Sequence, residues 1–419
     1  MDLFCLGGFR EVGRNALFVK TDKGVIFDYG VKVETGENPA WPKATVTDAL
    51  LTHGHLDHLG NSAVLYKNTR CNVYATSPTI DYADLLLRDS LKILKLKGQQ
   101  TKYSPTDIIN LKKALKKISY GDEISLSSKT SIEIWDAGHM PGSCIFVLKY
   151  KDKNKYKKIL YTGDFKLDPT RLVCGARFDA KDIDVAVMEC TYGSKEHPSR
   201  EESEKNLYEA IRQTVESGGI ALLPVYAIRA AEILMILDQF GANWPVYLDG
   251  MAKSATNIAL AHPEFVRNSK KLHDAVENAI PLFENEERNN AIQEPCVILT
   301  TGAAMEGGPI VHYMKQLYNR DDCAIIFTGY QIPRTAGRYL LDTGQYTIGA
   351  INLKVKMKIL SFDFSAHAGR SELLKFVQKV SPEKVICMHG DYCEKFATEI
   401  KSRFGINAIA PKNGDKIIV

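Results

Sequence analysis

The stretch "ALLTHGHLDHLGN", from Ala49 to Asn61, places three of the chain's ten histidines and one aspartate within six residues. It begins with an apolar run, which predicts a short buried strand that ends where the polar residues start. Such a loop is either a polar turn that happens to be rich in histidine or one half of a metal site. One short loop cannot close a coordination shell, so a metal site would need further ligands elsewhere in the chain.

The composition is that of a globular protein with a large core. The chain has 419 residues, of which 45% are hydrophobic and 25% charged, and this excludes a disordered or fibrous protein and allows two domains. The net charge of +4 permits an acidic partner without requiring one. Lysines gather in 92–102, 111–118 and 149–158. A solvated helix face or hairpin tip is the ordinary explanation of such runs, and a surface for nucleic acid is the alternative.

Cysteine usage and the N-terminus favour a cytoplasmic location. The nine cysteines include no Cys-x-x-Cys pair, and their number is odd, so we expect reduced core residues rather than a disulfide framework or a zinc ribbon. The start "MDLFCLGGFREVG" lacks the features of a signal peptide. No apolar run approaches the roughly 18 residues that a membrane span needs. We therefore expect no membrane association.

The first third of the chain is predicted to consist mainly of strands joined by tight turns. "NALFVKT" and "GVIFDYG" predict a hairpin around Asp22-Lys23-Gly24, and the segment 93–119 predicts helix on either side of Ser104-Pro105. Further strands are predicted in "SIEIWDAG", "SCIFVLKYK", "KKILYTGDF" and "IDVAVMECTYG".

From about Ser194 the pattern changes to alternating helices and apolar strands. "REESEKNLYEAIRQTVESGG" predicts a helix that ends at Gly218-Gly219, and several strand–helix pairs follow it, which is typical of a parallel sheet with helices on its faces. After about Ala350 the chain gives one strand, "LKVKMKILSF", then a helix and the strand "EKVICMHG". The middle block therefore looks inserted. We expect an α/β protein whose first domain spans residues 1–194 and 351–419 and whose inserted domain spans residues 195–350.

Several polar residues stand at the carboxyl ends of predicted strands, where they can converge above a sheet. These are Asp28, the loop residues His53, His55, Asp57 and His58, and the separate residues His139, Asp164 and His389. Imidazole and carboxylate are ligands that zinc favours, and seven of them with one bridging carboxylate suit a pair of ions about 3.5–4 Å apart. Asp28 fits better as a residue that orients a ligand. Lone histidines such as His262, His273 and His312 are expected to be ordinary surface or core residues.

The motifs resemble those of the metallo-β-lactamase superfamily. "THGHLDHLG", the histidine of "GHMPGS" and the aspartate of "YTGDF" match its ligand motifs in order. The insertion and three further motifs narrow the resemblance to the β-CASP nucleases: "VMECTYG" with Glu189, "FDFSAHAGR" with His367, and "CMHGD" with His389. The segment "TGAAMEGGP" departs from the Gly-Met pair of the family pattern. The resemblance implies a metallo-β-lactamase αββα sandwich with an inserted β-CASP domain.

The resemblance also implies a role for each residue. His53, His55 and His139 would hold one zinc ion, Asp57, His58 and His389 the other, and Asp164 would bridge the two. Asp57, Glu189 and His367 would be the catalytic residues, with His367 acting as general acid for the leaving 3′ oxygen or orienting the scissile phosphate, held by Glu189. Ser143, Gln331 and Arg338 are candidate RNA contacts. A capping role is nearly as good an explanation for Ser143, and a surface helix start is about equally good for Gln331 and Arg338.

The function implied is that of a ribonuclease with two Zn²⁺ per chain, acting as an endonuclease, a 5′-to-3′ exonuclease, or both. DNA-directed members of the family typically lack the histidine of the last motif, so His389 favours RNA processing or decay. The compact length resembles that of archaeal members. The alternatives are a hydrolase of a small ester or thioester and a non-catalytic RNA-processing subunit. The family also implies a homodimer or assembly with related β-CASP proteins.

Overall fold

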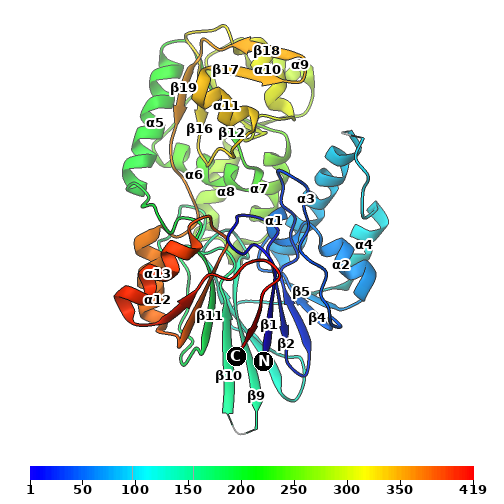
Figure 1. The fold of residues 1–419 in the computed structure, drawn as a ribbon. Helices are drawn as coiled ribbons and strands as arrows, with labels where there is room; N and C mark the ends of the chain where they lie inside the picture. The colour runs from blue at the N-terminus through cyan, green and yellow to red at the C-terminus, as the bar shows by residue number, and fades with distance from the viewer. Residues whose placement is uncertain (97, 154) are drawn as a thin grey trace. The chain divides into compact units, whose positions relative to one another are not determined.

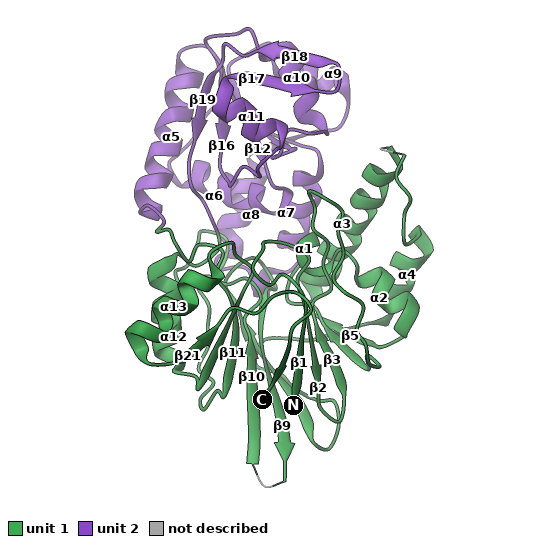
Figure 2. Cartoon of the chain, in the orientation of Figure 1, with its two compact units in different colours: residues 1–196, 366–419 green, residues 197–365 purple. Residues whose placement is uncertain are grey.

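The computed structural model describes residues 1–96, 98–153 and 155–419. Lys97 and Asn154, which belong to the lysine-rich segments 92–102 and 149–158, therefore lie outside the described residues. The chain divides into two compact units (Figure 2): unit 1 comprises Met1–Glu196 and Ala366–Val419, and unit 2 comprises His197–Ser365. The end of the inserted domain, expected at residue 350, lies before Ala366, where the chain returns to unit 1. The reason is that β19 (Lys358–Ser361) pairs with β16 (Ala324–Phe327) and so extends the sheet of unit 2.

Unit 1 contains two seven-stranded sheets. In spatial order, the first consists of β22 (Lys416–Ile418), β1 (Asp2–Gly7), β2 (Ala16–Lys20), β3 (Gly24–Phe27), β4 (Asp48–Leu50), β5 (Asn72–Ala75) and β6 (Leu115–Lys117). The second consists of β21 (Asn407–Ile409), β20 (Lys384–Met388), β11 (Val185–Glu189), β10 (Lys155–Tyr161), β9 (Cys144–Asp152), β8 (Thr130–Asp136) and β7 (Glu123–Ser125). Their inner faces share one apolar core, in which the rings of Phe27 and Tyr161 stack with centroids 5.1 Å apart.

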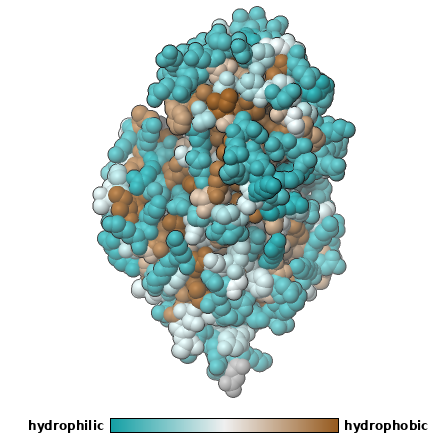
Figure 3. Space-filling view, turned by 180° about the vertical axis from the view of Figure 1, so that it is seen from behind, coloured by the Kyte–Doolittle hydropathy of each residue, from teal (hydrophilic) through white to brown (hydrophobic). Residues whose placement is uncertain are grey.

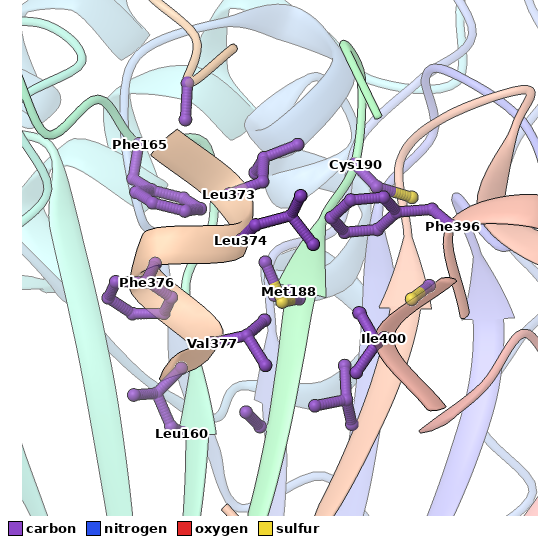
Figure 4. Packing of buried hydrophobic residues seen from close by; sticks show 14 of the residues in the cluster. Leu160, Phe165, Met188, Cys190, Leu373, Leu374, Phe376, Val377, Phe396 and Ile400 are labelled. Carbon is purple, nitrogen blue, oxygen red and sulfur yellow. The ribbon is translucent and has the colours of Figure 1, made fainter. Parts of the chain in front are cut away.

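Helices cover the outer face of each sheet in unit 1 (Figure 1). The helices α2 (Ser62–Thr69), α3 (Ser77–Leu96) and α4 (Pro105–Ala114) pack on the first sheet, and α12 (Arg370–Val380) and α13 (Cys393–Phe404) pack on the second. Figure 4 shows Phe376 of α12 near Phe165 and Phe396 of α13 near Cys190, with Met188 between the two rings. The predicted αββα sandwich is therefore confirmed. The described residues include no helix that has both the length and the apolar character to cross a membrane.

Unit 2 is built on one parallel sheet. Its spatial order is β14 (Ala279–Leu282), β13 (Val246–Asp249), β15 (Cys296–Thr301), β12 (Ile220–Val225), β16 and β19. The helices are α5 (Arg200–Glu216), α6 (Ala230–Gln239), α7 (Met251–Ala261), α8 (Ser269–Glu277), α9 (Asn285–Ala291), α10 (Pro309–Leu317) and α11 (Ala336–Thr343), and a hairpin of β17 (Gln345–Ile348) and β18 (Ile351–Lys354) follows them. The fully buried strands, such as β12 and β15, agree with the continuous apolar runs of the sequence.

Two segments differ from the prediction. The run 353–362, expected as one strand, divides into β18 and β19, which belong to different sheets, because the chain turns where the amide of Lys356 donates to the carbonyl of Tyr318. The helix expected through residue 119 ends at Ala114, because β6 pairs with β5 instead. The Ser-Pro break is confirmed, since Ser104 caps α4 in a capping box with Asp107.

We expect Phe376→Ala to destabilise unit 1. The ring is buried between α12 and the second sheet, where it meets Phe165 with ring centroids 4.6 Å apart. Truncating a buried phenylalanine to alanine costs about 3–5 kcal/mol. The free energy of unfolding, measured by chemical denaturation, should fall by that amount. Lys375→Ala, an exposed position on the same helix, is the control and should change it by less than about 0.5 kcal/mol. Equal effects of the two variants would contradict the packing described.

Candidate metal centre

The candidate ligands lie in unit 1, at one edge of its two sheets. They follow strand ends far apart in the sequence: His53 follows β4, His139 follows β8, Asp164 follows β10 and His389 follows β20. Because β3 and β4 are parallel, and β10, β11 and β20 are also parallel, their carboxyl ends lie at a common edge of each sheet. The backbone amide of His389 donates to the carbonyl of Gly8, which joins the edges of the two sheets. The topology thus brings together side chains that the sequence separates.

The loop of the opening motif is held close to the backbone of the neighbouring strand end. The amides of Asn15 and Tyr29 donate to the carbonyls of Asp57 and His58. A Cβ atom on Gly30 would lie 1.7 Å from the carbonyl oxygen of Asp57, so only glycine allows the loop to approach this closely. The position of the loop is therefore set by main-chain contacts.

A first group of ligand atoms surrounds one point. His55 Nδ1 lies 3.1 Å from His53 Nε2 and 3.2 Å from His139 Nε2. Asp164 Oδ2 lies 3.5 Å from His53 Nε2 and 3.8 Å from His139 Nε2. A tetrahedral ion with bonds of roughly 2.0–2.1 Å separates its ligand atoms by about 3.3 Å. The four atoms therefore fit a single zinc-sized ion.

A second group shares the carboxylate of Asp164. Its Oδ1 atom lies 3.3 Å from His58 Nε2 and 3.1 Å from His389 Nδ1. Asp57 Oδ2 lies 3.1 Å from His389 Nε2 and 3.8 Å from His58 Nε2. Asp164 Oδ1 is buried, and no described residue gives it a hydrogen bond of good geometry. A buried carboxylate oxygen aimed at ligand atoms, with no hydrogen bond of its own, fits a site for a cation. Asp164 thus faces both groups, with one oxygen toward each.

The two groups differ in charge. Burial lowers the pKa of His53 and His139, and it lowers that of His55 to about 4, so these rings are neutral at pH 7, as metal ligation requires. Burial also opposes the charged form of His389, but the carboxylate of Asp164 outweighs it and raises the pKa to about 10. The pKa of His58 is raised for the same reason. The second group therefore has an excess of negative charge, which favours positive charge on its rings or a cation between them.

Asp28 holds the ring of His58. Its Oδ2 lies 2.7 Å from His58 Nδ1, and it accepts hydrogen bonds from the Thr52 amide at 2.8 Å and the Tyr161 hydroxyl at 3.2 Å. Thr52 Oγ1 also lies 3.0 Å from His53 Nδ1, so this one hydroxyl contacts both Asp28 and a candidate ligand. Neither Thr52 nor Tyr161 was identified from the sequence. Their only signal is position, next to the histidine loop and at the end of an apolar strand.

His367 and Glu189 form a pair beside the shared carboxylate. His367 Nδ1 lies 3.0 Å from Glu189 Oε2, and His367 Nε2 lies 3.9 Å from Asp164 Oδ2. Glu189 is buried and accepts hydrogen bonds from the amide of Phe165 at 2.9 Å and the hydroxyl of Thr191 at 2.5 Å. The His367 side chain is 20% exposed, whereas Glu189 is 1% exposed. Nε2 of His367 is therefore the polar atom of the pair that solvent or a substrate can reach.

An ion pair ties the loop of Asp164 to the loop of His367. Lys166 Nζ lies 2.9 Å from Glu372 Oε2 and 3.4 Å from the carbonyl oxygen of His367. Glu372 also accepts hydrogen bonds from the amides of Leu167 at 3.0 Å, Asp168 at 2.9 Å and Gly369 at 3.0 Å. Both side chains are nearly buried. We call this ion pair the Lys166–Glu372 clamp. It was not identified from the sequence, because neither residue belongs to a ligand motif.

The predicted substrate contacts have varied surroundings. Ser143 is fully buried, and its hydroxyl accepts hydrogen bonds from the amides of His139 and Met140, which is the capping arrangement that the sequence left open. Gln331 is 5% exposed and lies in unit 2. Arg338 is half exposed on α11 and pairs with Asp342 at 2.7 Å. Of these three, Arg338 has the exposure that a nucleic-acid contact needs.

A further set of ligand atoms lies far from strand ends, on α8 of unit 2. It consists of His273, Asp274 and Glu277, and all three are exposed. His273 was expected to be an ordinary surface residue, and its contact with Glu277, at 3.5 Å, is an ion pair one turn along the helix. The set lacks the burial that distinguishes the centre in unit 1.

Comparison with known families matches three consecutive parts of the chain. Residues 33–184 match the metallo-beta-lactamase superfamily domain, residues 230–340 match the Beta-Casp domain, and residues 352–411 match the Zn-dependent metallo-hydrolase RNA specificity domain. A crystal structure of a protein of unknown function from Enterococcus faecalis aligns with a TM-score of 0.61 over 100% of this chain and 99% of its own, at 15% identity. That similarity shows the fold alone.

The alignments with sequence relatives cover nearly the whole chain. The probable RNase MJ4 of Methanocaldococcus jannaschii is 35% identical over 100% of both chains. RNase aCSPSF2 of Saccharolobus solfataricus is 35% identical, covering 98% of this chain and 84% of its own. Transcription termination factor FttA of Pyrococcus horikoshii is 36% identical, covering 98% of this chain and 70% of its own. With the αββα fold and the paired ligand groups, these matches confirm the resemblance: the chain belongs to the β-CASP family of metal-dependent ribonucleases in the metallo-β-lactamase superfamily.

Proposed function

We propose that this chain is a zinc-dependent ribonuclease that hydrolyses RNA phosphodiester bonds with two metal ions, in RNA processing or decay. The observation that carries the proposal is the shared carboxylate of Asp164, whose two oxygens face two separate groups of histidines. The Glu189–His367 pair beside it supports a nuclease over a hydrolase of small esters. The reduced cysteines agree with a cytoplasmic location.

In this proposal the two groups divide the ligands between two zinc ions. His53, His55 and His139 hold the first ion, Asp57, His58 and His389 hold the second, and Asp164 bridges them. Bound zinc ions would supply Lewis acidity, which acidifies a water molecule and neutralises charge that develops on the phosphate. Asp28 keeps His58 Nδ1 engaged, so that Nε2 is directed at the second site.

His367 acts on the substrate side of the centre. Glu189 holds Nδ1, which leaves Nε2 to donate a proton to the departing 3′ oxygen or to orient the scissile phosphate. The carboxylate of Glu189 raises the pKa of His367 against the effect of burial, which favours the protonated ring that a general acid needs. The products would carry a 5′ phosphate and a free 3′ hydroxyl. Of the three candidate contacts for the RNA backbone, Arg338 stays proposed because its side chain is exposed, whereas Gln331 and Ser143 are buried. Self-association or assembly with related proteins stays an expectation from the family.

Metal analysis tests the two-ion assignment. Purified protein should contain about two zinc ions per chain, because the two groups supply about three protein ligands each and one bridge. Asp164→Ala removes the bridge and should reduce the content to one ion or none. His312→Ala, a histidine of unit 2 that contacts Asn289, is the matched control and should retain both. A content of one zinc ion in the wild type would contradict the bridging role.

Replacement of the pair tests the acid role. His367→Ala should lower kcat on RNA by about 10²–10⁴-fold, because a positioned proton donor contributes that much, while the zinc content stays at the wild-type value. Glu189→Gln should cause a smaller loss, since the amide can still accept a hydrogen bond from the ring. An unchanged kcat in His367→Ala would exclude the acid role. Loss of zinc in the same variant would instead make His367 a ligand.

The Lys166–Glu372 clamp should position His367 against Asp164. Glu372→Gln keeps one acceptor oxygen but removes the charge, so we expect a fall in kcat with little change in KM for RNA or in zinc content. Glu372→Ala should lower kcat further and also stability, since it leaves several buried amides and Lys166 without an acceptor. Steady-state kinetics with metal analysis distinguishes the two effects. Equal kcat in Glu372→Gln and wild type would limit the clamp to stability.

One experiment separates the modes of cleavage. Purified protein is incubated with RNA that is labelled at the 5′ end and carries either a monophosphate or a triphosphate, and wild type is compared with His389→Ala. Internal fragments indicate endonuclease action, and release of mononucleotides only from 5′-monophosphate RNA indicates a 5′-to-3′ exonuclease. We expect His389→Ala to lose both activities, since it lacks a ligand of the second ion. Absence of cleavage by wild-type protein that holds its zinc would refute the ribonuclease proposal.

A further inference from the structure

Helix α3 begins at the metal centre and carries the chain away from it. The hydroxyls of Thr76 and Thr79, at its start, donate to the carbonyl of Gly142 in the His139 loop at 2.8 and 3.3 Å. A Cβ atom on Gly54, between His53 and His55, would lie 2.6 Å from Cβ of Tyr82. The first turns of α3 thus pack against both histidine loops. From Tyr82 to Lys95 the helix rises about 20 Å, and Figure 1 shows its far end projecting beyond the first sheet.

The far half of α3 carries positive charge on one face. Arg88, Lys92 and Lys95 are exposed and stand four and three residues apart, so they form one stripe, which we call the α3 basic stripe. Asp84 lies at its near end and is matched by Arg88 at 2.7 Å and by Lys112 of α4 at 3.3 Å. Neither Lys92 nor Lys95 forms an ion pair with a described residue. Burial raises the pKa of the half-buried Asp89, one turn before Lys92, and the charge of Lys92 partly opposes that effect. The stripe nevertheless retains cationic charge that no ion pair within the described chain neutralises.

The stripe borders a hollow with an apolar floor. The hollow has a volume of about 450 Å³, and its lining residues are Arg88, Leu91, Lys92, Lys95, Leu96 and Pro105. Leu91 is buried at its base, whereas Leu96 is 77% exposed. Cationic heads around an apolar floor suit a ligand that has both anionic and flat apolar parts. A nucleotide has this combination, since its phosphate attracts lysine and its base packs on hydrocarbon.

We propose that the α3 basic stripe is an accessory RNA-binding surface that holds the substrate strand a few nucleotides from the scissile phosphate. This inference rests on the proposed ribonuclease function and adds the path of the strand. Phosphates bind Lys92 and Lys95, Arg88 lies nearer the centre, and a base or ribose packs on the Leu91 floor. An RNA long enough to span the roughly 20 Å from the centre gains these contacts, whereas a very short RNA does not. The surface thus makes affinity depend on substrate length.

The test compares two charge-reversed variants. The stripe variant combines Lys92→Glu and Lys95→Glu. The hairpin variant combines Lys151→Glu and Lys155→Glu, and it makes the same charge change at the end of the β9–β10 hairpin, where both lysines are exposed. The strand β10 extends about 20 Å from this tip toward Asp164, which lies three residues beyond its end, so the tip lies more than about 20 Å from the centre. Figure 1 shows the tip at the opposite end of the sheet. Unfolding midpoints equal to wild type establish that both variants fold.

Binding is measured by fluorescence anisotropy on zinc-loaded protein, with hydrolysis-resistant, unstructured RNA analogues of about 30 and about 5 nucleotides. The stripe variant should bind the long RNA at least about tenfold more weakly, and its salt dependence should be shallower by about 1.4 in the slope of log K against log salt, the value for two lost phosphate contacts on a single strand. Its kcat/KM for the short RNA should stay within about twofold of wild type. The hairpin variant should match wild type in every measurement.

The outcomes separate this inference from the proposed function. Wild-type affinity for the long RNA in the stripe variant, alongside normal cleavage, would overturn the accessory surface and leave the ribonuclease intact. Equal weakening in both variants would show an effect of net charge alone and would also overturn it. A wild-type protein that holds zinc but neither binds nor cleaves RNA would refute the proposed function, and the accessory surface with it. Figure 3 shows the face opposite to that of Figure 1, where hydrophilic side chains cover much of the surface.

Discussion

The burial of Asp164 is the constraint on which the centre depends. A carboxylate taken out of water is strongly disfavoured unless positive charge or hydrogen-bond donors surround it. Asp164 is 2% exposed, and imidazole nitrogens lie within 4 Å of both its oxygens. Those nitrogens come from loops at the ends of different strands. The fold therefore has to bring several strand ends to one carboxylate, and the two facing sheets of unit 1 do so.

Two buried carboxylates beside the candidate ligands, Asp28 and Glu189, are each held by a fixed set of donors. Asp28 accepts hydrogen bonds from Thr52 and Tyr161, and its remaining side-chain contact is with the ring of His58. Glu189 has a backbone amide and a hydroxyl as donors and is left with one contact to His367. Because most of their acceptor capacity is filled by groups that cannot titrate near neutral pH, both carboxylates stay in place and direct one imidazole each. The arrangement orients the rings before any ion or substrate binds.

The layers and the clustering of the candidate ligands could be predicted from the sequence for a common physical reason. Candidate ligands such as His53 and Asp164 follow short apolar strands, so one pattern reveals both the strand and the polar residue at its end. The Lys166–Glu372 clamp could not be predicted from the sequence, because a lysine and a glutamate 206 positions apart carry no local signal. The division of 353–362 into two strands could not be predicted either, since β-pairing partners rather than local hydropathy decide where a strand ends. For Ser143 the sequence favoured a substrate contact only slightly over capping, and its burial and its hydrogen bonds to two loop amides support capping.

The connections of unit 1 to the insertion are themselves parts of the centre. On the outgoing side, Thr191 contacts both Glu189 and the ring of His389 before the chain leaves at Glu196. On the returning side, the carbonyl of Ala366 lies 2.9 Å from His139 Nδ1, one residue before His367. The two segments also meet each other, since the amide of Arg370 donates to the carbonyl of Lys195. Any change in how the chain leaves or re-enters unit 1 therefore acts directly on a candidate ligand and on the proposed acid.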